Sequence, residues 1–188
     1  IKQLLSRLAA QHGTRESVYA GEKRFTYDEF YQRILSLASA LKQIGIRPGD
    51  TVAVMDWDSH RDLECFFAVP IIGAVLHTIN IRLAPEQVLY TVNHAKDTAI
   101  LVHDEFLPLL ETLKNKTPTV KKWIRLTDIG NDIDPTWDDM IDSEYEEMLS
   151  TADREFKPED FDENIRATTF YTTGTTGNPK GVCFSQRQ

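Results

Sequence analysis

The sequence predicts an α/β fold with a mainly parallel sheet flanked by helices. Short runs of β-branched and other apolar residues alternate with longer segments in which apolar residues recur every three or four positions. One of these runs, residues 98–102 (T-A-I-L-V), has four consecutive apolar residues after its threonine, as in strands that helices cover on both faces. Strands that alternate with helices usually build parallel sheets, because each helix returns the chain to the edge at which the strands begin.

The first half of the chain has clear starts and stops for its elements. In chain order the predicted elements are a helix at 2–11, a strand at 22–25, a long helix after Thr26, a strand at 51–55, a helix at 60–69 and a strand at 74–78. Thr26 and Glu29 form the T-x-x-E pattern of a capping box, so the long helix is expected to begin there. Gly45 ends this helix, and a Pro-Gly-Asp turn leads into the next strand.

The second half continues the alternation. In chain order its predicted elements are a helix from Pro85 to about 95, a strand at 98–102, a helix at 106–114, a strand at 120–126, a helix at 137–149 and two strands around a loop at 171–180. Between Asp128 and Glu163 the chain holds fifteen acidic residues and two basic ones. The acids show no fixed spacing, which favours a solvated connection over a docking surface or a metal site. We therefore expect an α/β segment at 1–127, an acidic connection at 128–163 and a strand–loop–strand region at 164–188.

Composition limits the class of protein. The chain has 41% hydrophobic residues and a length that suits one globular domain. Its net charge of -8 argues against nucleic acid as a partner, because such proteins need a basic face. Cys65 and Cys183 lie far apart and are expected to be reduced thiols, as in a cytoplasmic protein. The most apolar run, residues 66–76, is too short for a transmembrane segment, and no signal peptide is visible.

The most informative segment is residues 171–182, Y-T-T-G-T-T-G-N-P-K-G-V. Its glycines allow tight turns and a close approach of the backbone to a ligand. Successive backbone N–H groups in such a turn bind anions, the threonine hydroxyls add short donors, and Lys180 adds a mobile positive charge. These features predict a loop that holds a polyphosphate. The simpler alternative is a surface hairpin whose glycine, asparagine and proline only form the turn.

This loop differs from the Walker A motif of P-loop NTPases. In that motif the lysine directly follows the second glycine and a helix comes next. Here Asn178 and Pro179 separate Gly177 from Lys180, and residues 180–184 alternate like a strand. The sequence therefore predicts a hairpin between two strands, and the P-loop NTPase reading fails on the lysine spacing.

Residues 171–182 resemble the phosphate-binding signature of the AMP-forming adenylating enzymes: acyl-CoA synthetases, luciferases and the adenylation domains of peptide synthetases. Residues 45–54 (G-I-R-P-G-D-T-V-A-V) resemble the opening of that family's large domain, and residues 73–94 resemble its fatty-acyl-CoA ligase branch. The resemblance spans essentially the whole chain but only the first part of a complete family member. It implies the N-terminal portion of the large domain of an acyl-CoA-synthetase-like fold, without the C-terminal domain.

The resemblance also implies a reaction. A carboxylic acid, expected to be a fatty acid, would react with ATP to give an acyl-adenylate and pyrophosphate, and coenzyme A would then take the acyl group as a thioester. Mg²⁺ would assist, with the hydroxyl of Thr172 as one ligand. The residues implied in nucleotide binding are Thr172, Thr173, Gly174, Thr175, Thr176, Gly177 and Lys180. No catalytic residue is expected in this chain, because by analogy the adenine pocket, the acidic Mg²⁺ ligand and the catalytic lysine lie beyond Gln188. The fragment alone is therefore expected to be inactive.

Several alternatives remain open at this point. Ile81 stands where this branch usually has proline, and Gln186 stands where it usually has histidine, so no role is carried over to Gln186. A peptide-synthetase adenylation domain or a luciferase-like enzyme belongs to the same class, and strict dependence on coenzyme A would separate them. The alternative outside the enzyme class is a naturally short, non-catalytic protein that serves as a nucleotide-binding or interaction module. Exposed edges of an incomplete sheet would favour self-association, so a homo-oligomer is a further expectation.

Two groups of polar residues are expected to be structural. Four histidines form no metal-ligand pattern and are expected to be buried structural or surface residues: His60, His77, His94 and His103. Three aspartates lack the continuation of a calcium-binding loop and are expected to cap the helix at 60–69: Asp56, Asp58 and Asp62.

Overall fold

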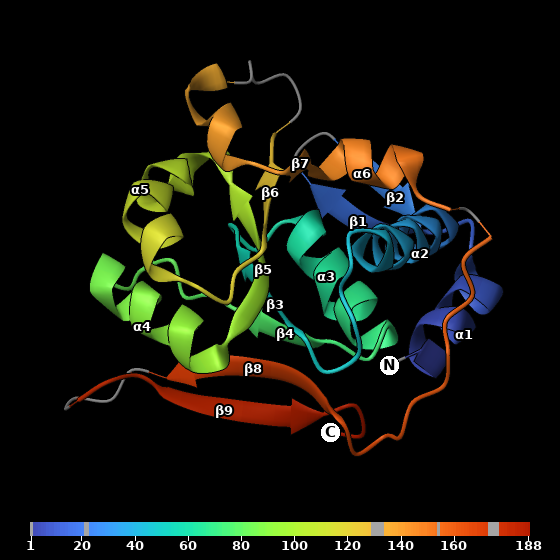
Figure 1. Ribbon diagram of the computed structural model, residues 1–188. Helices are drawn as coiled ribbons and strands as arrows, with labels where there is room; N and C mark the ends of the chain where they lie inside the picture. The colour runs from blue at the N-terminus through green and yellow to red at the C-terminus, as the bar shows by residue number, and fades with distance from the viewer. Residues whose placement is uncertain (1, 21–22, 129–133, 154, 173–176) are drawn as a thin grey trace.

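The computed structural model of the chain describes residues 2–20, 23–128, 134–153, 155–172 and 177–188. A seven-stranded sheet with strand order β7-β6-β5-β3-β4-β8-β9 forms its centre (Figure 1). In that order the strands are Ser143–Glu144, Lys122–Leu126, Asp97–His103, Thr51–Met55, Val75–Thr78, Arg166–Thr172 and Lys180–Ser185. Neighbouring strands are parallel except β8 and β9, which form an antiparallel hairpin. The predicted α/β class with a mainly parallel sheet is confirmed.

Helices cover both faces of this sheet (Figure 1). On one face lie α2 (Tyr27–Gln43), α3 (His60–Ile71) and α6 (Tyr145–Thr151), and on the other lie α4 (Pro85–Ala95) and the short α5 (Leu110–Leu113). Alternation along β3 divides the core between the two faces. Val52 and Val54 join the cluster beneath α2 and α3, whereas Ala53 and Met55 join the cluster beneath α4. Burial on both faces explains why the middle of the central strands, residues 52–55 and 99–102, is apolar.

The N-terminal elements lie beside the main sheet. Helix α1 (Lys2–His12) packs against α2, and the strands β1 (Glu16–Ala20) and β2 (Lys23–Thr26) form a separate antiparallel pair. The predicted capping box is present at the start of α2. The Glu29 carboxylate accepts from the Thr26 N–H at 2.7 Å, and Thr26 Oγ1 accepts from the Glu29 N–H at 3.2 Å. This reciprocal pair satisfies two donors that the helix start would otherwise leave unpaired.

The cap of α3 differs from the prediction. Ser59, and none of the three aspartates, is the N-cap, and its Oγ accepts from the Arg61 N–H at 3.1 Å. Asp56 instead accepts a hydrogen bond from the Ser59 hydroxyl and another from the Trp57 N–H. The prediction was wrong because serine competes equally well for this position, and the cap is decided by which residue directly precedes the first helical turn.

The prediction of one continuous helix at 137–149 is also wrong. A 3₁₀ segment at Pro135–Met140 is followed by the short strand β7, and only Tyr145–Thr151 is helical. The interruption has a tertiary cause, since Asp142 joins the edge of the sheet. Its N–H donates to the Trp123 carbonyl at 2.9 Å, and its carboxylate accepts from the Trp123 N–H at 2.8 Å. The segment predicted as helical at 106–114 begins as a 3₁₀ turn that contains Pro108, and its α-helical part is α5.

Two expectations from composition can be compared with the structure. Cys65 is buried and Cys183 is exposed, and both are free thiols, as predicted. Burial raises the pKa of the Cys65 thiol well above its usual value, so this side chain is an inert part of the core. Within the described residues, none of the helices combines the length and the apolar character that a bilayer crossing requires.

A buried ion cluster ties α2, α3 and α6 together. Arg33 of α2 donates to both carboxylate oxygens of Glu64, at 2.5 and 3.2 Å, and to both oxygens of Glu146, at 2.9 and 2.8 Å. Glu64 is completely buried and also accepts from the Tyr145 hydroxyl at 2.5 Å. Burial disfavours the charged guanidinium, but the hydrogen bonds to Glu146 and Glu64 outweigh this effect and hold the pKa of Arg33 above its usual value. The cluster therefore fixes α6 from the acidic segment onto the core.

Asp62, in the first turn of α3, gives a pH-dependent prediction. Burial, together with the nearby charges of Asp56 and Asp58, raises its pKa from 3.8 to about 6. The folded state therefore holds the Asp62 proton more tightly than the unfolded state, and this contribution to stability is lost as pH rises from about 4 to about 6. Asp62→Asn should stabilise the fold by about 1 kcal/mol at pH 7.5 and change it little at pH 4.

Urea unfolding at the two pH values measures this difference. Asp139→Asn is the matched control, because Asp139 is an exposed carboxylate for which no stabilisation is expected. An Asp62→Asn effect of equal size at pH 4 and pH 7.5 would contradict the assignment.

Candidate functional site

The path of the chain through the sheet creates a crevice between two neighbouring strands. The segment after β3 leads to α3 on one face of the sheet, whereas the segment after the adjacent β4 leads to α4 on the opposite face. The two connections therefore diverge at the carboxyl edge of the sheet. In open α/β sheets, ligands bind at such a switch point, outside the carboxyl ends of the strands.

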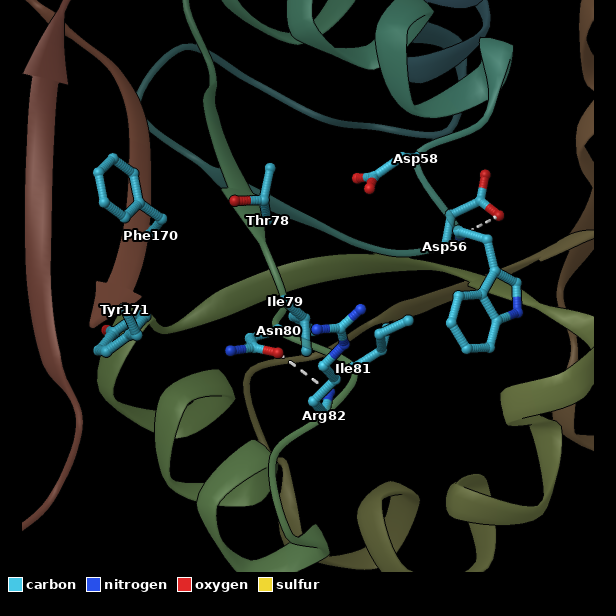
Figure 2. A pocket seen from close by; sticks show the side chains of 10 residues that line it. Asp56, Asp58, Thr78, Ile79, Asn80, Ile81, Arg82, Phe170 and Tyr171 are labelled. Carbon is cyan, nitrogen blue, oxygen red and sulfur yellow. Dashed lines mark hydrogen bonds between the residues drawn. The ribbon is translucent and has the colours of Figure 1, made fainter. Parts of the chain in front are cut away.

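A cavity of about 510 Å³ lies at this switch point (Figure 2). Its lining residues follow β3, end or follow β4, or belong to the end of β8: Asp56, Trp57, Asp58, Thr78, Ile79, Asn80, Ile81, Arg82, Phe170 and Tyr171. Figure 2 shows the Asn80 and Arg82 side chains on the β4 side of the cavity, between Tyr171 and Asp56. Its volume lies in the range of small-molecule sites.

The charged groups of the cavity differ in how fully they are already paired. Asp56 is occupied by hydrogen bonds from Ser59 and the Trp57 N–H, and the Arg61 guanidinium lies 3.7 Å away. The Arg82 side chain is exposed. The backbone N–H of Arg82 donates to the Asn80 side-chain oxygen at 3.0 Å, which orders the turn after β4. No carboxylate of the described residues forms an ion pair with the Arg82 guanidinium. The cavity thus offers an exposed guanidinium beside the hairpin of β8 and β9.

The β8–β9 hairpin carries the glycine- and threonine-rich loop at the same edge of the sheet. The two residues of β8 that line the cavity, Phe170 and Tyr171, directly precede Thr172. Thr172 pairs with Lys180 across the hairpin, so the loop leaves and re-enters the sheet at these two positions. β8 and β9 form the antiparallel hairpin that the sequence predicts. Thr172, at which the loop begins, therefore directly follows a residue that lines the cavity.

The structure describes three of the seven predicted nucleotide-binding residues. Thr172 is exposed at the end of β8, and Gly177 has φ of +92°, a conformation that would strain a residue with a side chain. Lys180 is exposed at the start of β9, and no carboxylate among the described residues pairs with its ammonium group. Thr173, Gly174, Thr175 and Thr176 lie outside the described residues. Of the three described residues, Thr172 and Lys180 face each other where the loop leaves and re-enters the sheet.

A polar network connects Tyr171, the residue before the start of the loop, to the buried His77 and Asp97 and to the exposed His94. The Tyr171 hydroxyl lies 2.7 Å from Nδ1 of His94 on α4. The Tyr171 ring packs 5.1 Å from the ring of His77 on β4, and His77 Nδ1 lies 2.8 Å from the carboxylate of Asp97 at the start of β5. Burial and the nearby charge of Asp97 raise the pKa of Tyr171 to about 12. The Tyr171 hydroxyl is therefore protonated at neutral pH and can donate to His94.

The histidines and Gln186 have structural partners. His77 and His94 belong to the polar network of Tyr171, and His103 lies 3.3 Å from the Asp128 carboxylate. In the described part of the chain no group of three or more His, Cys, Asp or Glu side chains is arranged to hold a metal ion. The Gln186 amide donates to the Pro70 carbonyl at 2.9 Å, which ties the end of β9 to α3.

Sequence reasoning missed Asn80, Arg82 and the role of Tyr171. Their shared signal is position, because each lies at or just beyond the carboxyl end of a predicted strand. That signal becomes specific only when the order of the strands is known, since the order decides which strand ends meet.

Comparisons with known proteins find relatives of this chain in sequence and in fold. A family model described as AMP-binding enzyme matches residues 5–188. The chain is 38% identical over 191 residues to a medium-chain-fatty-acid–CoA ligase of Ectopseudomonas oleovorans, a match that covers 100% of this chain and 35% of the relative. It is 37% identical over 187 residues to a long-chain-fatty-acid–CoA ligase of Thermus thermophilus, covering 97% of this chain and 32% of the relative. The chain thus spans about a third of the length of these curated relatives.

The fold also matches solved structures. The crystal structure of the anthranilate CoA ligase AuaEII in complex with anthranoyl-AMP superposes with a TM-score of 0.88 at 21% identity. The match covers 98% of this chain and 34% of that chain. At this level of identity the likeness is evidence of the fold alone, and it confirms the predicted acyl-CoA-synthetase-like fold.

Proposed function

Because the chain belongs to the AMP-binding enzyme family, we propose that it forms part of an ATP-dependent acid–CoA ligase. In this reaction a carboxylate attacks the α-phosphate of ATP, the bond between the α- and β-phosphates breaks, and pyrophosphate leaves. The thiol of coenzyme A then attacks the carbonyl carbon of the acyl-adenylate, AMP leaves, and a thioester forms. The observation that carries the proposal is the exposed Lys180, which pairs across the hairpin with Thr172, the residue that follows the cavity-lining Tyr171.

The chemical difficulty of the first step is the meeting of two anions. A negatively charged carboxylate must approach a negatively charged phosphate, so positive charge and N–H donors must be in place before the reaction. We assign this role to the loop between Thr172 and Lys180, which would grip the β- and γ-phosphates. The Lys180 ammonium would neutralise part of the charge that develops on the leaving pyrophosphate. Gly177, with its left-handed backbone, would allow the main chain to approach the phosphates.

At this site Mg²⁺ would be held mainly by the phosphates of the nucleotide and less by protein side chains. Mg²⁺ prefers oxygen ligands and in nucleotide sites is commonly held by substrate phosphates, water and one or two protein groups. The exposed Thr172 hydroxyl is one such oxygen, and its contact with the Lys180 carbonyl is long, at 3.5 Å. A bound Mg²⁺ would supply charge neutralisation at the phosphates. Thr172 would help to orient the ion, and the Lys180 ammonium group would neutralise part of the negative charge that remains on the phosphates.

We propose a fatty acid as the substrate class. Support comes from the two relatives named as fatty-acid–CoA ligases, at 38% and 37% identity. The test is thioester formation by the protein that carries this chain, with a panel of acetate, octanoate, palmitate and benzoate. The proposal expects a product only with both ATP and coenzyme A, and higher kcat/KM with octanoate or palmitate than with acetate or benzoate. Continuous release of AMP without coenzyme A, or no thioester with any acid when ATP and coenzyme A are both present, would contradict the ligase assignment, and a preference for benzoate would contradict the fatty-acid assignment.

A further inference from the structure

We propose that Tyr171, held by His94 and by the His77–Asp97 pair, is a positioning residue that fixes Thr172 and Lys180, the two residues from which the nucleotide-gripping loop leaves and re-enters the sheet. The proposal rests on the proposed function of that loop. Tyr171 would not touch the nucleotide. It would act through the backbone of Thr172, the next residue, at which the loop begins.

The base of this arrangement is a buried pair between neighbouring elements. The His77 and Asp97 side chains are almost completely excluded from solvent, and His77 Nδ1 lies 2.8 Å from Asp97 Oδ2. His77 leans across β3 to reach Asp97, and the residue level with it on β3 is the small Ala53. Burial raises the pKa of Asp97, although the electrostatic interaction and the hydrogen bond with His77 act in the opposite direction. The pair gives Tyr171 a fixed polar surface to pack on.

The Tyr171 ring is enclosed on several sides. The His77 ring lies 5.1 Å away, and the His94 ring meets it edge-on at 5.7 Å. His94 is itself stacked on Tyr90 of the same helix, at 5.5 Å. On the hairpin partner β9, Gly181 lies opposite Tyr171, and a β-carbon at Gly181 would come within 3.4 Å of the ring. The ring of this β8 residue therefore packs directly against the backbone of β9.

This enclosure has a consequence for the loop. Tyr171 and Gly181 are the hairpin pair next to Thr172 and Lys180, from which the loop leaves and re-enters the sheet. The hydroxyl bond to His94 joins this pair to α4, whereas the ring contact with His77 joins it to β4. Without the hydroxyl bond, the ring would still fill its place but could shift along the strand. Small displacements of groups that orient a phosphate reduce catalysis, because the reacting geometry is narrow.

The first test compares two tyrosine-to-phenylalanine variants. Tyr171→Phe removes the hydrogen bond to His94 and keeps the ring. Tyr145→Phe is the control: Tyr145 lies on α6, far from the loop, and the variant removes its buried hydrogen bond to Glu64. In the protein that carries this chain, Tyr171→Phe should raise the KM for ATP about three- to tenfold and leave the KM for the acid unchanged. Tyr145→Phe should lower stability without changing either KM. An unchanged KM for ATP in Tyr171→Phe would overturn the proposal.

A second test follows the coupling of the two side chains. His94→Ala should raise the KM for ATP as Tyr171→Phe does. The double variant should be no worse than either single variant, because each substitution removes the same hydrogen bond between Tyr171 and His94. Additive effects would overturn the proposal.

Amide hydrogen exchange of residues 172–182 distinguishes failure of this proposal from failure of the proposed function. Protection by Mg²⁺–ATP in the wild type, and its loss in Tyr171→Phe, is the expected result. Equal protection in both proteins would overturn only the role of Tyr171, whereas no protection in the wild type would overturn the nucleotide-binding function of the loop itself.

Discussion

Replacement of Lys180 by alanine should lower kcat/KM for acyl-adenylate formation by about 10²- to 10³-fold, the loss typical of one electrostatic donor in a pre-organised site. The side chain is exposed, and it projects from the start of β9 at the mouth of the loop. Its removal should therefore leave the fold intact while removing positive charge from the phosphates. Steady-state kinetics of adenylate formation, with circular dichroism of the variant, separates the two effects.

Lys121→Ala is the matched control for this variant. Lys121 is also an exposed lysine, but it precedes β6 and lies at the amino edge of the sheet, opposite the loop. Its replacement should change kcat/KM less than twofold. A folded Lys180→Ala protein that forms adenylate at the wild-type rate would remove Lys180 from the mechanism.

The second large effect is expected in the ion cluster of Arg33, Glu64 and Glu146. Arg33→Met keeps much of the volume of the side chain but leaves the completely buried Glu64 carboxylate without its cation. Removing one partner of a buried ion pair costs about 3–5 kcal/mol, because the remaining charge is neither hydrated nor neutralised. The free energy of unfolding, measured by urea denaturation, should fall by this amount.

An exposed ion pair on the same helix shows what burial contributes. Lys42 of α2 pairs with Glu159 at 2.7 Å, but their side chains are 42% and 63% exposed. Lys42→Ala should cost less than about 1 kcal/mol, since water already screens this pair. Equal losses for Arg33→Met and Lys42→Ala would contradict the account of the cluster.

The features that the sequence predicted correctly are those encoded locally. The alternation of apolar strands and amphipathic helices predicts the parallel sheet, and the capping box at Thr26 and Glu29 marks a helix start within four residues. The hairpin around the loop follows from the spacing between Gly177 and Lys180, with Pro179 between them. In each case the chemistry of adjacent residues determines the structure, so one sequence is enough.

The features that the sequence did not predict depend on distant contacts. The cavity forms because β3 and β4 are neighbours whose connections diverge, and the strand order is set by the whole sheet. Tyr171 meets His94 across 77 positions of the chain, which no local pattern encodes. The helix predicted at 137–149 is interrupted because Asp142 finds backbone partners on β6, an interaction that overrides local helix propensity.

The most direct test of the central claim is the fate of ATP labelled on its γ-phosphate. The protein that carries this chain is incubated with octanoate, Mg²⁺ and the labelled nucleotide, and the products are separated. The loop and the family predict that label leaves as pyrophosphate, that AMP is the other nucleotide product once coenzyme A is added, and that both require the acid. Release of the label as inorganic phosphate, with ADP formed whether or not the acid is present, would contradict the adenylation account.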